Sequence, residues 1–200
     1  MNTKLFVLPS LLLGGAAMLV LPARESQAFT KIGGSLSTSQ RDLRVFNNFA
    51  DAASNNTTSP AQFQGWDGAE LAIWKGAVEW GSLMHGDGTG DPQSGNVLGG
   101  AGANFDAFWA GAATAIGGTN NNIVSTVSSC SSGVIAYMEG PISDGWRIRF
   151  CDSSFVFDDG PGAPAQIDIQ CIMAHEYGHA LGLGHSTSNG ATMFASYGGG

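Results

Sequence analysis

The segment from His175 to His185 constrains the fold more than any other part of the chain. It reads His-Glu-Tyr-Gly-His-Ala-Leu-Gly-Leu-Gly-His and holds three of the four histidines in the 200-residue sequence. If the segment is helical through Leu181, His175 and His179 stand one turn apart on the same face, so both imidazoles can reach one metal ion. A pair of histidines with this spacing, with glutamate directly after the first, is typical of a zinc site.

A third ligand is expected from beyond this helix. A catalytic zinc ion takes three protein ligands and keeps its fourth position open. His185 is predicted to be the third ligand if the chain turns sharply after Leu181, and Gly182 can adopt the left-handed conformation that ends helices. Glu176 lies about 100° around the helix from His175. It is too far around to be an equal ligand, but it can reach a water bound to the metal, so we predict that it is the general base.

The motif resembles the signature of a known family. The spacing His-Glu-x-x-His-x-x-Gly-x-x-His is the metzincin signature, and the residues after it resemble the matrixin branch of these zinc peptidases. Ser186 follows the third histidine, and Met193 falls where matrixins carry the methionine of the Met-turn beneath the metal. Tyr197 falls where they carry a tyrosine in the wall of the pocket for the residue after the scissile bond. Ala195, however, stands where matrixins usually have proline.

The resemblance implies a fold and an activity. The expected fold is an α+β, metzincin-like catalytic domain: a twisted, mostly parallel sheet with one antiparallel edge strand, packed on two helices. The expected activity is that of a secreted zinc metalloendopeptidase with one catalytic zinc ion, which hydrolyses peptide bonds with a zinc-activated water. The alternative is a secreted zinc-binding protein whose metal site is inactive or structural. The presence of Glu176 favours the peptidase.

Hydrophobic periodicity predicts the elements of this fold. A helix is expected after Asp67, with apolar positions up to Leu83, and the active-site helix is expected to start between Ala165 and Asp168. Met173, Ala174, Tyr177 and Leu181 are expected to seat that helix on the core. Strands are expected over 41–49, 123–127, 133–137, 146–150 and 155–157, whereas 103–118 has no assignment. The segment 133–137 resembles the matrixin edge strand, so a polypeptide substrate is expected to pair along it near Ala136. The alternative for this segment is an ordinary hairpin strand.

The N-terminal segment predicts export, and the remainder of the chain predicts one domain. Residues 1–28 have a basic start, an apolar run and a small-x-small end, which indicate a secretory signal peptide cleaved before Phe29. An uncleaved membrane anchor is the alternative. Residues 29–200 are interpreted as one catalytic domain, apparently truncated after the Met-turn because matrixins continue into a C-terminal helix. The net charge of −8 argues against nucleic-acid or anionic-lipid partners. A monomer without stable membrane association is expected after cleavage.

Three cysteines in an exported chain predict one disulfide and one free thiol. The favoured disulfide joins Cys130 to Cys151 and would stabilise the fold by roughly 3 kcal/mol in the chain-entropy model. Cys171 would then be free. It lies one turn before His175, and as a fourth ligand it would make the zinc site structural. A Ca²⁺ site is conceivable in the glycine-rich segment 85–102, which carries Asp87 and Asp91, but a turn-rich loop is favoured.

Overall fold

The computed structural model describes residues 32–33, 42–54, 67–80, 107–140, 145–160 and 166–197. The predicted signal peptide, the conceivable calcium segment 85–102 and the C-terminal glycines lie outside these residues, as do positions 81–83 of the first helix. Within the described part of the chain, no helix combines the length and the apolar character needed to cross a membrane.

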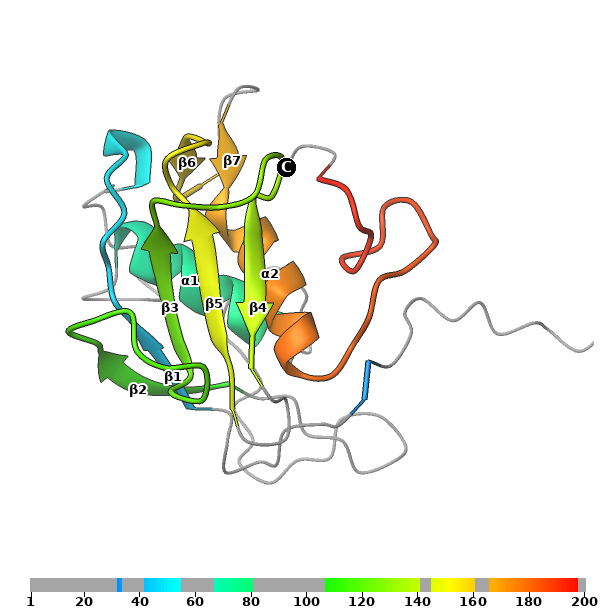
Figure 1. Cartoon of the computed structure of the whole chain (residues 1–200), viewed down its shortest axis with the longest axis horizontal. Helices are drawn as coiled ribbons and strands as arrows, with labels where there is room; N and C mark the ends of the chain where they lie inside the picture. Colours follow the sequence, from blue (N-terminus) through cyan, green and yellow to red (C-terminus); the bar gives the residue numbers. More distant parts are fainter. Residues whose placement is uncertain are drawn as a thin grey trace, which may run out of the picture.

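The main sheet has five strands in the order β2-β1-β3-β5-β4 (Figure 1). They are β1 (Asp42–Val45), β2 (Phe108–Ala112), β3 (Ile123–Val127), β4 (Ala136–Glu139) and β5 (Arg147–Cys151). All neighbours are parallel except β4, which runs antiparallel to β5 at one end of the order. Both α-helices lie on one face of this sheet, behind it in Figure 1. The predicted fold class is confirmed.

Most strands depart from their predicted bounds: Arg147–Cys151 replaces 146–150, and Phe157–Asp158 replaces 155–157. The edge strand β4 begins at Ala136 rather than at 133, because Gly133 has φ +80 and the Val134 N–H donates to the Ser131 carbonyl, so a turn fills this stretch. The first strand is shorter than predicted and ends at Val45. The unassigned stretch contains β2, which is rich in small residues and pairs irregularly with β1. Such a strand lacks the alternation of apolar and polar residues from which a strand is predicted.

Charged side chains hold the edge strand in register. Glu139 of β4 stands opposite Arg147 of β5, and its Oε2 accepts hydrogen bonds from Nε of Arg147 at 2.6 Å and from Nε of Arg149 at 2.9 Å. Because Ile148 and Phe150 of β5 face the core, alternation puts the arginines on the face of the sheet away from the helices. Opposite charges across a strand pair stabilise that pairing. These ion pairs therefore hold β4 against β5 from the face of the sheet opposite the helices.

The helices are α1 (Gly68–Val78) and α2 (Ile169–Ala180). Asp67 is the N-cap of α1 as predicted, although its side chain makes no capping hydrogen bond. The active-site helix α2 starts just after its predicted window. There, β7 (Ile167–Asp168) pairs with β6 (Phe157–Asp158) in a small second sheet before the helix begins. Asp168 then caps α2, its Oδ1 accepting from the Cys171 N–H at 3.0 Å.

The two helices approach each other closely. A Cβ at Gly76 of α1 would lie 2.6 Å from the Gln170 carbonyl oxygen and 2.7 Å from Met173 Cβ, so only glycine permits this separation. The predicted apolar stripe of α2 is buried, as expected. The largest fully buried side chains of the core come from the sheet, from α1 and α2, and from the segments next to them: Trp146, Tyr177, Phe150, Phe157, Leu43, Ile73, Ile148, Ile169, Met173 and Met193.

The predicted disulfide between Cys130 and Cys151 is present. It ties the chain after β3 to the end of β5, two neighbouring parallel strands. Cys171 is free, also as predicted, and it is exposed. The disulfide therefore belongs to the sheet, whereas the free thiol lies in the first turn of α2.

Candidate metal centre

The chain reverses immediately after α2. The Leu181 N–H donates to the Tyr177 carbonyl at 2.9 Å, and the Leu183 N–H donates back to the Gly178 carbonyl at 3.0 Å. Between them Gly182 has φ +98, which confirms the predicted left-handed turn. This reversal carries the next segment back along the helix, so the third histidine returns to the first two.

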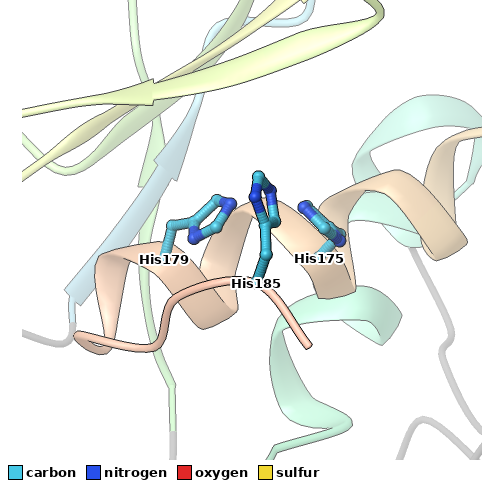
Figure 2. Close-up of side chains that lie close together, drawn as sticks. All are labelled: His175, His179 and His185. Carbon is cyan, nitrogen blue, oxygen red and sulfur yellow. The ribbon is translucent and has the colours of Figure 1, made fainter. Parts of the chain in front are cut away.

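Three imidazoles converge at this point (Figure 2). His175 and His179 project from α2, and His185 projects from the returning segment to lie between them. Their candidate ligand atoms all lie within 4.8 Å of one another. The three ring centroids are separated by 4.8 Å, 4.9 Å and 5.3 Å. The sequence-predicted ligands are thus brought together, and they form the one such metal-ligand cluster among the described residues.

Backbone carbonyls orient two of the rings. The Nδ1 of His175 lies 2.7 Å from the Thr192 carbonyl oxygen, and the Nδ1 of His179 lies 2.7 Å from the Leu183 carbonyl oxygen. A carbonyl can only accept, so each Nδ1 carries the proton and each Nε2 keeps a lone pair. This is the tautomer that metal binding needs, and such partners also fix ring orientation. Sequence reasoning missed both carbonyls, since a backbone acceptor leaves no mark in residue identity.

Burial favours the neutral rings. It lowers the pKa of His175 and of His179, and the hydrogen bonds to Thr192 and Leu183 oppose that change only in part. The neighbouring histidines add to the lowering, because two protonated rings would repel each other. A metal ion competes with protons for these nitrogens, so a lowered pKa keeps the ligands available at neutral pH.

Glu176 lies in a different environment from the histidines. Its side chain is buried, with 6% exposed, and within the described residues Oε2 has no hydrogen-bond partner. Burial raises the pKa of Glu176 to about 7, against the effect of a hydrogen bond from the backbone N–H of Met138 in β4. Buried polar atoms are normally satisfied, so an orphaned carboxylate oxygen on the residue next to the ligand His175 indicates a functional group rather than a packing residue.

Met193 lies beneath the helix, on the returning chain. It is 2% exposed, and a Cβ on Gly178 would overlap its Sδ atom, so the methionine is pressed against the helix between the two ligands. The Ser186 N–H donates to the Met193 carbonyl at 2.7 Å, and Ser186 also forms a bridge with Phe194. The methionine turn is thereby tied to the segment that carries His185.

The remaining predicted residues lie around this centre. Ala136 begins the edge strand and is half-buried, opposite Phe150 of β5. The hydroxyl of Tyr197 accepts from the Asp168 N–H at 3.2 Å, which ties the end of the described chain to the start of α2. Cys171 is no member of the histidine cluster.

The donor set fits zinc. Three converging imidazoles, two of them with Nδ1 held by a backbone carbonyl, are the ligand type and number of a catalytic zinc site, and the buried Glu176 directly follows the first of them in α2. A mostly parallel sheet with an antiparallel edge strand, backed by two helices and carrying this triad, defines a zinc-dependent metallopeptidase of the metzincin type.

Comparison with known proteins gives the family. The family model for Matrixin matches residues 53–199, which is most of the chain. The chain therefore belongs to the matrixin family of zinc metalloendopeptidases, and the histidine triad is its zinc-binding motif. A comparison with curated proteins returned no match.

Proposed function

We propose that this matrixin hydrolyses peptide bonds in extended polypeptides, with Glu176 as its general base and His175, His179 and His185 as the ligands of one zinc ion. The observation that carries the proposal is the convergence of three imidazoles together with a buried carboxylate, with one orphaned oxygen, on the residue that directly follows His175. A bound zinc ion supplies Lewis-acid activation of the attacking water and of the scissile carbonyl. Residues that hold the ion must keep three nitrogens unprotonated, which the Thr192 and Leu183 carbonyls favour for two of them.

Glu176 handles the proton. In the metal-free chain burial raises the pKa of Glu176 to about 7, so this carboxylate is more basic than an ordinary glutamate and is better suited to accept a proton and give it back. Its Oε2 would take the proton of the attacking water and then deliver it to the leaving nitrogen. No covalent intermediate with the protein is needed, because water is the nucleophile.

The edge strand is proposed to hold the substrate. The Ile135 carbonyl accepts a hydrogen bond from the Cys151 N–H of β5 at 2.9 Å. Because backbone groups alternate in direction along an antiparallel strand, those of Ala136 and Met138 point away from β5, toward the open edge. A peptide added there as another strand gains main-chain hydrogen bonds that do not depend on its side chains. The Met138 N–H, which donates to Glu176, lies on this same edge. Tyr197 is proposed to wall the pocket for the residue after the scissile bond, and Met193 to support the metal centre.

Export completes the proposal. The disulfide is typical of an oxidising compartment, and matrixins are typically secreted. We propose that residues 1–28 are removed and that residues 29–200 act outside the cell as a monomer.

The experiment is zinc analysis together with cleavage of casein, an unstructured protein, on the chain starting at Phe29. One zinc ion per chain and cleavage that stops on adding a chelator are expected. Glu176→Gln is expected to keep the zinc ion but to lose activity by about 10²–10⁴-fold, because it removes the proton acceptor. An active Glu176→Gln variant would contradict the assigned base. Zinc without cleavage in the unmodified chain would instead favour a zinc-binding protein with an inactive site.

A further inference from the structure

Trp80 lies directly behind the zinc-binding helix, just past the end of α1. Its indole Nε1–H donates to the Ala174 carbonyl at 2.7 Å, across a large separation in sequence. Ala174 is the residue immediately before the ligand His175. The hydrogen bond therefore acts on the helix backbone at the position from which the first imidazole projects.

The ring of Trp80 also reaches the second ligand position. A Cβ on Gly178 would lie 2.8 Å from Cζ2 of Trp80, so the indole lies directly against the helix backbone there. Gly178 immediately precedes the ligand His179. One side chain thus contacts the residue before each of the two helical ligands, once by a hydrogen bond and once by close packing.

The same contact extends to the third ligand. The hypothetical Cβ on Gly178 would also overlap Sδ of Met193, so Trp80 and Met193 crowd the same glycine. The Met193 carbonyl in turn accepts from the N–H of Ser186, the residue after His185. A continuous set of contacts therefore connects Trp80 to all three imidazole positions, and none of these contacts involves an imidazole ring.

We propose that Trp80 is a positioning residue of the zinc centre, which holds the spacing of the three ligands from behind the helix. Residues that orient metal ligands affect both metal affinity and activity even though they do not bind the metal themselves. A tryptophan that merely filled the core would affect the stability of the fold alone. The two roles are separated by zinc affinity and by the geometry of the bound ion.

The test compares Trp80→Phe with Trp74→Phe. Phenylalanine keeps an aromatic ring but removes the Nε1–H and the reach toward Gly178. Trp74 is also on α1, where its ring packs edge-on against Trp109 of β2 with centroids 6.2 Å apart, on the sheet side and away from the ligands. Trp74→Phe is therefore a matched control for the loss of an indole from the same helix.

Trp80→Phe is expected to weaken zinc binding roughly tenfold in a chelator competition, at the low end for residues that orient metal ligands. The visible absorption spectrum of the cobalt-substituted protein should also change, and kcat on a peptide should fall while KM stays the same. Trp74→Phe should leave the zinc affinity and the cobalt spectrum unchanged. Zinc affinity and spectrum that match the unmodified chain in Trp80→Phe, or that change equally in both variants, would overturn the proposal.

A second variant covers the case in which Trp80→Phe does not fold. Gly178→Ala pushes a methyl group against Trp80 and Met193 from the helix side, whereas Gly160→Ala meets nothing closer than 3.9 Å. Weaker zinc binding in Gly178→Ala alone supports the positioning role, and unchanged binding refutes it. Zinc affinity and the cobalt spectrum do not require cleavage, so these readouts remain valid even if the proposed peptidase activity fails.

Discussion

The two helices that pack on the sheet are similar in length but differ in the residues that they bury. α1 has 11 residues and α2 has 12. The buried positions of α1 are apolar residues and glycines only: Gly68, Ala69, Leu71, Ala72, Ile73, Gly76, Ala77 and Val78. α2 also buries an apolar face but includes Glu176 among its buried residues, while His175 and His179 are half-buried. The glutamate on the first turn of α1, Glu70, is likewise half-buried rather than enclosed.

The difference separates stability from chemistry. Burying a carboxylate without full hydrogen bonding costs free energy, and folding alone gives no reason to keep it. Packing of α1 supplies apolar burial and the close approach at Gly76, which brings α1 against the start of α2. The apolar packing of α1 therefore offsets the cost of keeping the buried Glu176 in α2.

The largest expected effect is that of His179→Ala on α2. Removing one of three ligands should abolish binding of one zinc ion per chain, and cleavage should fall by more than about 100-fold, since even residues that only orient ligands cost 10–100-fold. Zinc analysis and casein cleavage measure the two losses. Substituting Glu70 on α1 with Gln should change neither. If His179→Ala kept its zinc ion, another donor would have to replace the imidazole, and the triad would be misassigned.

The sequence alone allowed most of this centre to be predicted. His175, His179 and His185 were found because metal ligation restricts both residue type and spacing, and Gly182 because the turn needs a left-handed residue. Trp80 falls only among the apolar positions expected for the first helix, because nothing in its spacing along the chain indicates a contact with Ala174.

The sheet was predicted less evenly than the metal centre. The strand Ile123–Val127 matched its expected bounds, since its β-branched residues signal a strand. β2 was missed, because its small residues are placed by pairing with β1 rather than by local preference. Predictions therefore succeeded where chemistry restricts residue choice and failed where only tertiary pairing does.

A smaller effect is expected for the stability of the metal-free protein. The pKa of Glu176 is raised to about 7 in the fold, against 4.5 for an ordinary glutamate. The folded state thus holds its proton more tightly than the unfolded state does. Below pH 4.5 the group is protonated in both states and leaves the free energy of unfolding unchanged. As pH rises from 4.5 toward 7, the unfolded state ionises first and the free energy of unfolding falls. Glu176→Gln should therefore stabilise the metal-free fold by roughly 3 kcal/mol above pH 7.

Glu70→Gln provides the matched comparison on the other helix. Glu70 has a raised pKa through burial and through the nearby charge of Asp67, but it keeps access to solvent. Its substitution should change the free energy of unfolding by no more than about 0.5 kcal/mol. Urea unfolding at pH 5 and pH 8 in the presence of a chelator measures both variants. Equal responses from the two glutamates would remove the distinction between the helices.

The smallest expected effect is that of Cys171→Ser, which tests whether the first turn of α2 belongs to the scaffold or to the metal centre. Partial desolvation of this surface side chain and the charge of Asp168 raise the pKa of the Cys171 thiol, so in the metal-free chain it stays protonated at neutral pH, whereas a zinc ligand must be a thiolate. The thiol is exposed, and the capping bond to Asp168 uses the Cys171 backbone, which serine retains. Zinc affinity, cleavage and the unfolding midpoint should therefore all match the unmodified chain. A marked loss of zinc affinity would mean that a thiolate closes the fourth position, and α2 would then carry a structural metal site instead of a catalytic one.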